Sequence, residues 1–119
     1  MATATLNKEK IFNVGTAGQD ATKWRLWKHA TSTAATNKYA EGTLANNPAP
    51  LTQNQFYRVQ ANQIVITQTA GTVMTEEFAK DELRGVLGRN TWLELFSDAS
   101  DGAFKTNRVS VAPGDWTIA

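Results

Sequence analysis

The sequence of 119 residues contains no cysteine and a single histidine, His29. Without cysteine there can be no disulfide, thiolate zinc site, iron–sulfur cluster or cysteine nucleophile. Metal sites built on histidine usually need two or three of them, which one chain does not supply. Small secreted domains commonly depend on disulfides, so the lack of cysteine favours folding inside a cell. We therefore expect a protein that is made in the cytoplasm and carries no metal and no cofactor.

The groups needed for catalysis are also scarce. The chain has four serines, Ser32, Ser97, Ser100 and Ser110, and none of them lies in a Gly-x-Ser-x-Gly setting. The carboxylates within 76–82 fit the solvated face of a helix better than a pair that faces each other across a cleft. No nucleophile is therefore matched with a base that would activate it, and we expect no enzymatic activity.

Long apolar runs and a strong net charge are missing too. No stretch of about 18 apolar residues occurs, so no transmembrane helix is expected. The first six residues lack the basic start and the apolar centre of a signal peptide. The formal net charge is only +1 at pH 7, and overall electrostatics gives no reason to expect a nucleic-acid partner. We expect neither a membrane nor a nucleic acid among the partners.

The sequence does contain enough apolar and aromatic residues for one core. Hydrophobic residues make up 41% of the chain, with four Trp and five Phe, and a chain of this length normally folds as one domain. Residues 1–9 show no hydrophobic period. We therefore expect a single β-rich domain over residues 10–119, preceded by a flexible N-terminal arm over residues 1–9.

Short segments with strand patterns, separated by turn residues, predict a mainly β fold. The expected strands lie at 10–14, 23–30, 55–60, 63–68, 91–96, 103–105, 108–111 and 116–118. Turns at this spacing are typical of a β-sandwich or barrel, and we expect a jelly-roll-like arrangement of about six to eight short strands. Residues 31–55 follow neither a strand nor a helix pattern. They are expected to form a long loop, which in a small domain is often an assembly contact.

One α-helix is predicted between Thr75 and Leu87. Thr75 is a preferred N-cap residue, and Glu76 and Glu77 follow in the first turn, where the helix dipole favours negative charge. The apolar residues recur with helical spacing on one face: Ala79, Leu83, Val86 and Leu87. Gly88 provides a stop signal directly after the last of them.

Aromatic and basic residues alternate in the second expected strand, which makes this region the candidate partner or glycan contact. Trp27 is expected to share a strand face with Arg25. Lys28 follows directly, and Tyr39 lies a short distance along the chain. If Trp27 and Tyr39 were exposed on one face, they could stack on sugar rings. The alternative is that Trp24 belongs to the core and Trp27 packs under a loop, because tryptophan is usually largely buried.

The composition as a whole resembles that of small virion proteins of tailed bacteriophages. The similar features are the leader Met1-Ala2-Thr3-Ala4-Thr5-Leu6-Asn7, the abundance of Ala, Thr, Asn and Gln, the absence of Cys and the compact β-rich body. Capsid decoration, or cement, proteins are the most similar in size. The resemblance implies a β-sandwich or barrel with a flexible N-terminal arm, located in the virion between the major capsid proteins as a homo-oligomer, with a trimer favoured. It carries over no binding residue, because no position matches a family motif.

Three alternative functions stay open. A phage tail or fibre accessory protein would have a similar composition, and a carbohydrate-binding module would use an exposed Trp27 and Tyr39. A small protein that blocks a host factor would show a strongly charged face, which a charged-residue content of 19% does not favour. Each of these proteins would present a preformed surface to another macromolecule without making or breaking a covalent bond.

Overall fold

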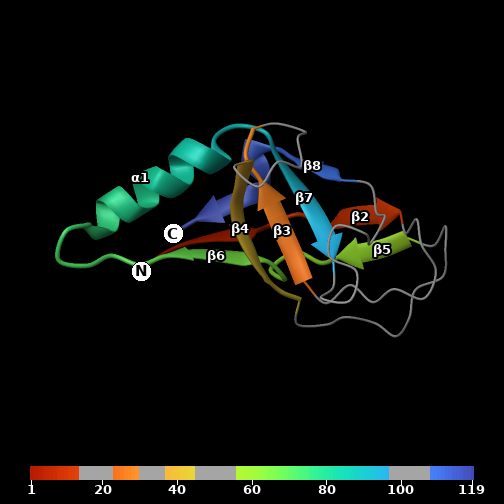
Figure 1. The fold of residues 1–119 in the computed structure, drawn as a ribbon, viewed down its shortest axis with the longest axis horizontal. Helices are drawn as coiled ribbons and strands as arrows, with labels where there is room; N and C mark the ends of the chain where they lie inside the picture. The colour runs from red at the N-terminus through yellow and green to blue at the C-terminus, as the bar shows by residue number, and fades with distance from the viewer. Residues whose placement is uncertain (14–22, 30–36, 45–55, 97–107) are drawn as a thin grey trace.

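The computed structural model describes residues 1–13, 23–29, 37–44, 56–96 and 108–119. This part of the chain contains nine strands, one α-helix and one short 3₁₀ turn (Figure 1). In chain order these are β1 (Ala2–Leu6), β2 (Lys10–Asn13), β3 (Lys23–Trp27), β4 (Lys38–Thr43), β5 (Phe56–Val59), β6 (Val65–Gln68), α1 (Glu76–Leu87), β7 (Thr91–Phe96), β8 (Val109–Val111), η3 (Pro113–Asp115) and β9 (Trp116–Ile118). The mainly β fold with one helix confirms the prediction.

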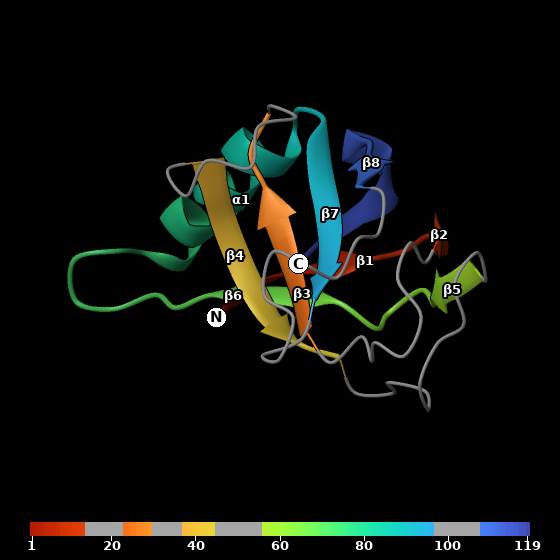
Figure 2. The ribbon, with the colours of Figure 1, turned by 45° about the vertical axis from the view of Figure 1, so that its right-hand side comes forward.

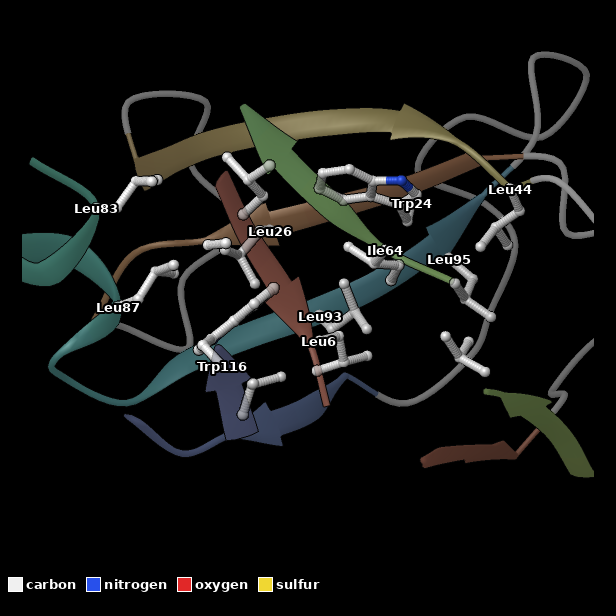
Figure 3. Close-up of a cluster of buried hydrophobic side chains, with 14 of the residues drawn as sticks. Leu6, Trp24, Leu26, Leu44, Ile64, Leu83, Leu87, Leu93, Leu95 and Trp116 are labelled. Carbon is white, nitrogen blue, oxygen red and sulfur yellow. The ribbon is translucent and has the colours of Figure 1, made fainter. Parts of the chain in front are cut away.

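The strands form two larger sheets and one small ribbon, all antiparallel. One sheet has the order β6-β1-β9, the second has the order β4-β3-β7-β8, and β2 pairs with β5. Figures 1 and 2 show the two larger sheets crossing each other, with the β2–β5 ribbon at one end of the molecule and α1 towards the other. Buried side chains from both sheets and from α1 meet in one core (Figure 3). This layered arrangement is that of a β-sandwich.

β1 shows that the predicted flexible N-terminal arm is wrong. It is the middle strand of its sheet, paired with β6 on one side and with β9 on the other. Ala2, Ala4 and Leu6 are fully buried, and the N-terminal ammonium group forms an ion pair with Glu76 Oε2 at 2.9 Å. Alternating alanine gives little hydrophobic signal in the sequence. Its small side chain nevertheless suits a strand against which α1 packs.

β4 lies inside the region that was expected to be a loop. The structure places this strand alongside β3, so the prediction of one continuous loop over 31–55 is wrong. The sequence of β4 has no regular apolar face. In the structure its pairing with β3 changes register at an irregularity between Leu26 and Trp27, so the side chains do not alternate regularly along the strand. Three predicted segments lie outside the described residues: the rest of the loop, at 31–36 and 45–55, the turn at 97–102 and the strand at 103–105.

Seven strands and the helix fall where the sequence pattern placed them. The strands are β2, β3, β5, β6, β7, β8 and β9. At the start of α1, the Thr75 side chain accepts a hydrogen bond from the Phe78 N–H at 3.2 Å, as expected of an N-cap. Ala79, Leu83 and Leu87 are buried, and the helix packs against β1, β6 and β9. No helix of the described residues is long and apolar enough to cross a membrane.

A nearly buried ion pair fastens β2 to the turn before β9. Lys10 Nζ lies 2.6 Å from Asp115 Oδ2, and the two side chains are 12% and 10% exposed. The same carboxylate accepts a hydrogen bond from the Ala112 N–H at 2.9 Å. Burial raises the pKa of Asp115, but the hydrogen bonds from Lys10 and Ala112 and the positive charges of Lys10 and Lys8 together outweigh it, so that the pKa lies below its ordinary value of 3.8. The η3 turn is therefore organised around an ionised carboxylate.

Candidate functional site

β3 brings two of the four candidate residues together on the outer face of the four-stranded sheet. Arg25 and Trp27 are two residues apart on this strand and therefore point to the same side. Trp27 is only 3% exposed. The guanidinium carbon of Arg108 lies 4.3 Å from the centre of its ring, and that of Arg25 lies 5.7 Å away. Trp27 is therefore buried, with two arginine side chains near its ring, and does not offer a platform to a sugar.

Arg25 is engaged with its neighbours on the same face. Its guanidinium lies 3.3 Å from a carboxylate oxygen of Glu41 and 3.3 Å from one of Glu94. It also stacks over the Phe96 ring, at 4.0 Å from the centre. Burial lowers the pKa of Arg108, and the attraction of Glu94 only partly opposes this shift. The cluster has the character of a packed, internally neutralised sheet face.

Lys28 and Tyr39 lie apart from this cluster. Lys28 follows β3, and its N–H donates a hydrogen bond to the Asn37 carbonyl at 2.7 Å. Tyr39 is on β4, where its hydroxyl accepts a hydrogen bond from Gln68 Nε2 on β6 at 2.8 Å. The structure therefore does not place Tyr39 and Trp27 on one exposed surface, which is what the carbohydrate-binding alternative requires. Of the four candidates, Tyr39 borders a cavity formed by described residues.

That cavity is a groove between β4 and β6, one edge strand from each of the two larger sheets. It has a volume of about 450 Å³. Its walls are residues 39–43 of β4 and Val65–Gln68 of β6, and Gln63 and Trp24 complete the lining. In Figure 2, β4 runs down across the front of the molecule towards β6. The groove therefore lies where the sandwich is open between its two sheets.

The Tyr39–Gln68 hydrogen bond spans the groove at the end nearest α1. Burial raises the pKa of the Tyr39 phenol, the hydrogen bond from Gln68 lowers it, and the negative charge of Glu82 on α1 raises it, with a net upward shift. The phenol is therefore neutral at physiological pH. Its oxygen already accepts from Gln68, and its own proton has no acceptor within the described ranges, so it can be donated to a bound group.

Trp24 lies beneath the groove, where the lack of a side chain at Gly42 leaves room for its indole ring. A Cβ atom added at Gly42 would lie 2.8 Å from the indole atoms Cε2, Cζ2 and Nε1 of Trp24. The ring is 4% exposed, so it has no room to move away. Glycine at this position of a strand thus permits close approach of the indole to the backbone.

Sequence reasoning missed most of the groove. Gly42 and Gln68 were not among the candidates, although a glycine within a strand is a known signal of close packing. Gly42 was overlooked because β4 itself was not expected. Amide residues such as Gln63 and Gln68 give no pattern that separates a groove from an ordinary polar surface.

The groove offers hydroxyl, amide and main-chain groups, which suit hydrogen bonding to a polypeptide. Among the residues that the structure describes, no group of three or more His, Cys, Asp or Glu is placed to hold a metal ion. No family model, no curated protein and no solved structure matches the chain. The function is therefore argued from the groove and from the sequence.

Proposed function

We propose that the chain is a non-enzymatic structural protein that joins a larger particle as an oligomer, of the kind that decorates the capsids of tailed bacteriophages. The observation that carries this proposal is the groove between the two sheet edges, β4 and β6. An open sandwich edge is a site at which an extended polypeptide segment can add, because main-chain groups supply affinity and flanking side chains supply selectivity.

The chemistry of the groove supports a polypeptide as its occupant. The polar lining of the groove consists of the Tyr39 hydroxyl, the Glu41 carboxylate, two glutamine amides and a threonine on each wall. The one aromatic ring beneath it, Trp24, packs against Gly42 and is almost fully buried. A sugar platform needs an exposed ring face, so the groove fits an extended chain better than a glycan.

The composition supports placement in a virion. Charged residues make up only 19% of the chain, and Ala, Thr, Asn and Gln are abundant, as in the phage virion proteins that the sequence resembles. A surface of amides and hydroxyls suits lasting contact with a fixed neighbour, since few charges have to be desolvated. We propose the major capsid protein as that neighbour, and a tail or fibre protein is the alternative within the same class.

The proposal is tested on particles of a phage that encodes the chain. Quantitative mass spectrometry of purified particles should find the chain in many copies per particle, and gold labelling should place it on the head. Particles prepared without the chain should bind the purified protein when it is added back. Absence of the chain from particles, together with failure to rebind, would overturn the proposal, and labelling of the tail would overturn the capsid assignment.

A matched pair of variants tests the role of the groove. Thr43→Arg places a long charged side chain in the groove wall, and Thr72→Arg places the same side chain at an exposed position outside the groove. Both variants should keep the wild-type melting temperature. Thr43→Arg should reduce rebinding at least about tenfold, because the long side chain fills the groove and its charge would have to be desolvated when the groove is occupied, whereas Thr72→Arg should rebind normally. Equal rebinding of the two variants would remove the groove from the assembly contact.

A further inference from the structure

The edge of β6 has none of the charged side chains, prolines or bulges that proteins use to protect a sheet edge, although the strand is only four residues long. Exposed edges are normally blocked by charged side chains, by proline or by bulges, because unpaired N–H and C=O groups can pair with another chain. From residue 59 to residue 75 the sequence contains no charged residue and no proline. β6 lies in the middle of this segment, with Val65 46% exposed and Thr67 also exposed. The strand is therefore open to pairing.

The main-chain groups at this open edge can be identified from the pairing with β1. The Leu6 N–H donates to the Ile64 carbonyl at 3.0 Å, and Ala4 lies opposite Ile66 in the same register. In an antiparallel pair, residues that face the neighbouring strand alternate with residues that face away. The N–H and C=O groups of Val65 and Thr67 therefore point to the side opposite β1, where the described part of the chain provides no further strand.

We infer that β6 pairs with β6 of a second copy of this chain, antiparallel, with Ile66 on the two-fold axis. This inference rests on the proposed function in one respect, namely that the chain works as an oligomer. In this register Val65 of each copy lies opposite Thr67 of the other copy, which gives two equivalent pairs. Each pair forms two main-chain hydrogen bonds, and the four bonds use every outward N–H and C=O group of these two residues. The contact joins two three-stranded sheets into one sheet of six strands.

The side chains fit the same register on both faces. On the exposed face, Val65 would lie beside the equally β-branched Thr67 of the second copy, a favourable cross-strand combination. On the inner face, Ile66, which is 5% exposed, would meet its own copy and extend the core. The uncharged strand matches itself in length, polarity and outward groups, so a second copy can pair with it without bringing like charges together. A two-fold contact produces dimers, unlike the trimer that the phage resemblance implies.

The inference is tested by charge swapping at the β6 edge. The double variants Val65→Lys with Thr67→Lys, and Val65→Glu with Thr67→Glu, place like charges directly opposite each other in the proposed pair. In sedimentation velocity over a range from micromolar to millimolar, the wild type should reach twice the 13.0 kDa chain mass. Each double variant alone should raise the dimer Kd at least about tenfold. An equimolar mixture of the two should form the dimer again, because opposite charges then meet.

A matched control carries the same added charge on the other edge of the same sheet. Thr117→Lys with Ala119→Lys changes β9 and the residue after it, both exposed, and should dimerise like the wild type. A wild type that stays monomeric at millimolar concentration, or double variants that still dimerise separately, would overturn the inference. These outcomes are independent of the particle experiment, since a chain absent from virions can still dimerise, and a chain present in virions can be monomeric in solution.

Discussion

β4 and β6 are both edge strands and both line the groove, but they are built differently. β4 pairs with β3 through an irregular register, and its exposed side carries Lys38 and Glu41, which lie 3.5 Å apart. Glu41 is also tied to Arg25 on β3. β6 pairs with β1 in a regular register and carries no charge. One edge thus has the features that discourage further pairing, and the other has none of them.

The difference shows how an open sandwich can be specific about where it associates. If both edges were equally bare, a segment from another chain could add to either one, and the assembly would have no defined geometry. Of the two edges that border the groove, protection of β4 leaves β6 as the one that accepts a strand. The groove then has two different walls: β4 keeps its shape, and β6 can pair with another strand.

The largest effect is expected from breaking the β4 wall at Gly42. In Gly42→Val the new Cβ would start 2.8 Å from the Trp24 indole, so the ring or the strand must shift. Overpacking of this kind in a core destabilises by about 3 kcal/mol at its upper end. Urea unfolding should show this loss in the free energy of unfolding, and the groove should no longer keep its shape.

The control for this prediction is Gly71→Val, in the segment that follows β6. A Cβ at Gly71 meets no atom within 4 Å, so this substitution should change the free energy of unfolding by less than about 0.5 kcal/mol. If both variants unfolded at the same urea concentration, the view that β4 is locked against Trp24 would be wrong.

A smaller effect is expected at Asp115, which holds the turn that leads into the sheet of β6. Asp115→Asn removes the charge that pairs with Lys10 and should lower the free energy of unfolding by about 2 kcal/mol at pH 7. The folded-state pKa of Asp115 lies below its ordinary value of 3.8. Its contribution is therefore complete above that value and is lost as the pH falls through the lower, folded-state pKa. The difference between wild type and variant should vanish in acid.

Hydrogen exchange can show whether the loss of the Asp115 charge acts on the sheet that contains β6 or on both sheets. Because Asp115 lies just before β9, acid should expose the amides of β1 and β9 before those of β3 and β7. Asp81→Asn serves as a control, since Asp81 pairs with Arg84 on the exposed face of α1 and should have little effect at any pH. Loss of protection that is uniform over both sheets would show that the ion pair does not act on the sheet of β6 in particular.

The sequence predicted strands and helix where side-chain periodicity was strong, and failed where other forces decide the structure. β7 alternates in burial over Thr91–Leu95, and α1 has a capping threonine and an apolar stripe. β1 was missed because its buried face consists largely of alanine, whose place in the sheet is decided by α1 packing over it. β4 was missed because an edge strand with an irregular register needs no apolar face.

The candidate site was harder to predict, because it depends on which residues meet across the two sheets. The alternation of Arg25 and Trp27 is compatible with an exposed contact surface and with a packed sheet face. Trp27 is only 3% exposed, which decides for the packed face. Tyr39 borders the groove, and no pattern in the sequence predicted this. Its partner, Gln68, is 29 residues away, and only the packing of β4 near β6 brings the two together.

The smallest effect is expected from the hydrogen bond between Tyr39 and Gln68, which joins the two edges across the groove. Tyr39→Phe removes the hydroxyl that accepts from Gln68 at 2.8 Å, and Gln68→Ala removes the donor. Each change should lower the free energy of unfolding by about 1 kcal/mol. In the double variant the losses should not add, because either substitution alone already breaks the bond. A coupling of about 1 kcal/mol from urea unfolding would show that the pairing edge and the protected edge stabilise each other. If the losses were strictly additive, the β6 wall would be energetically independent of β4, and strand addition at β6 could proceed without any response from the opposite wall.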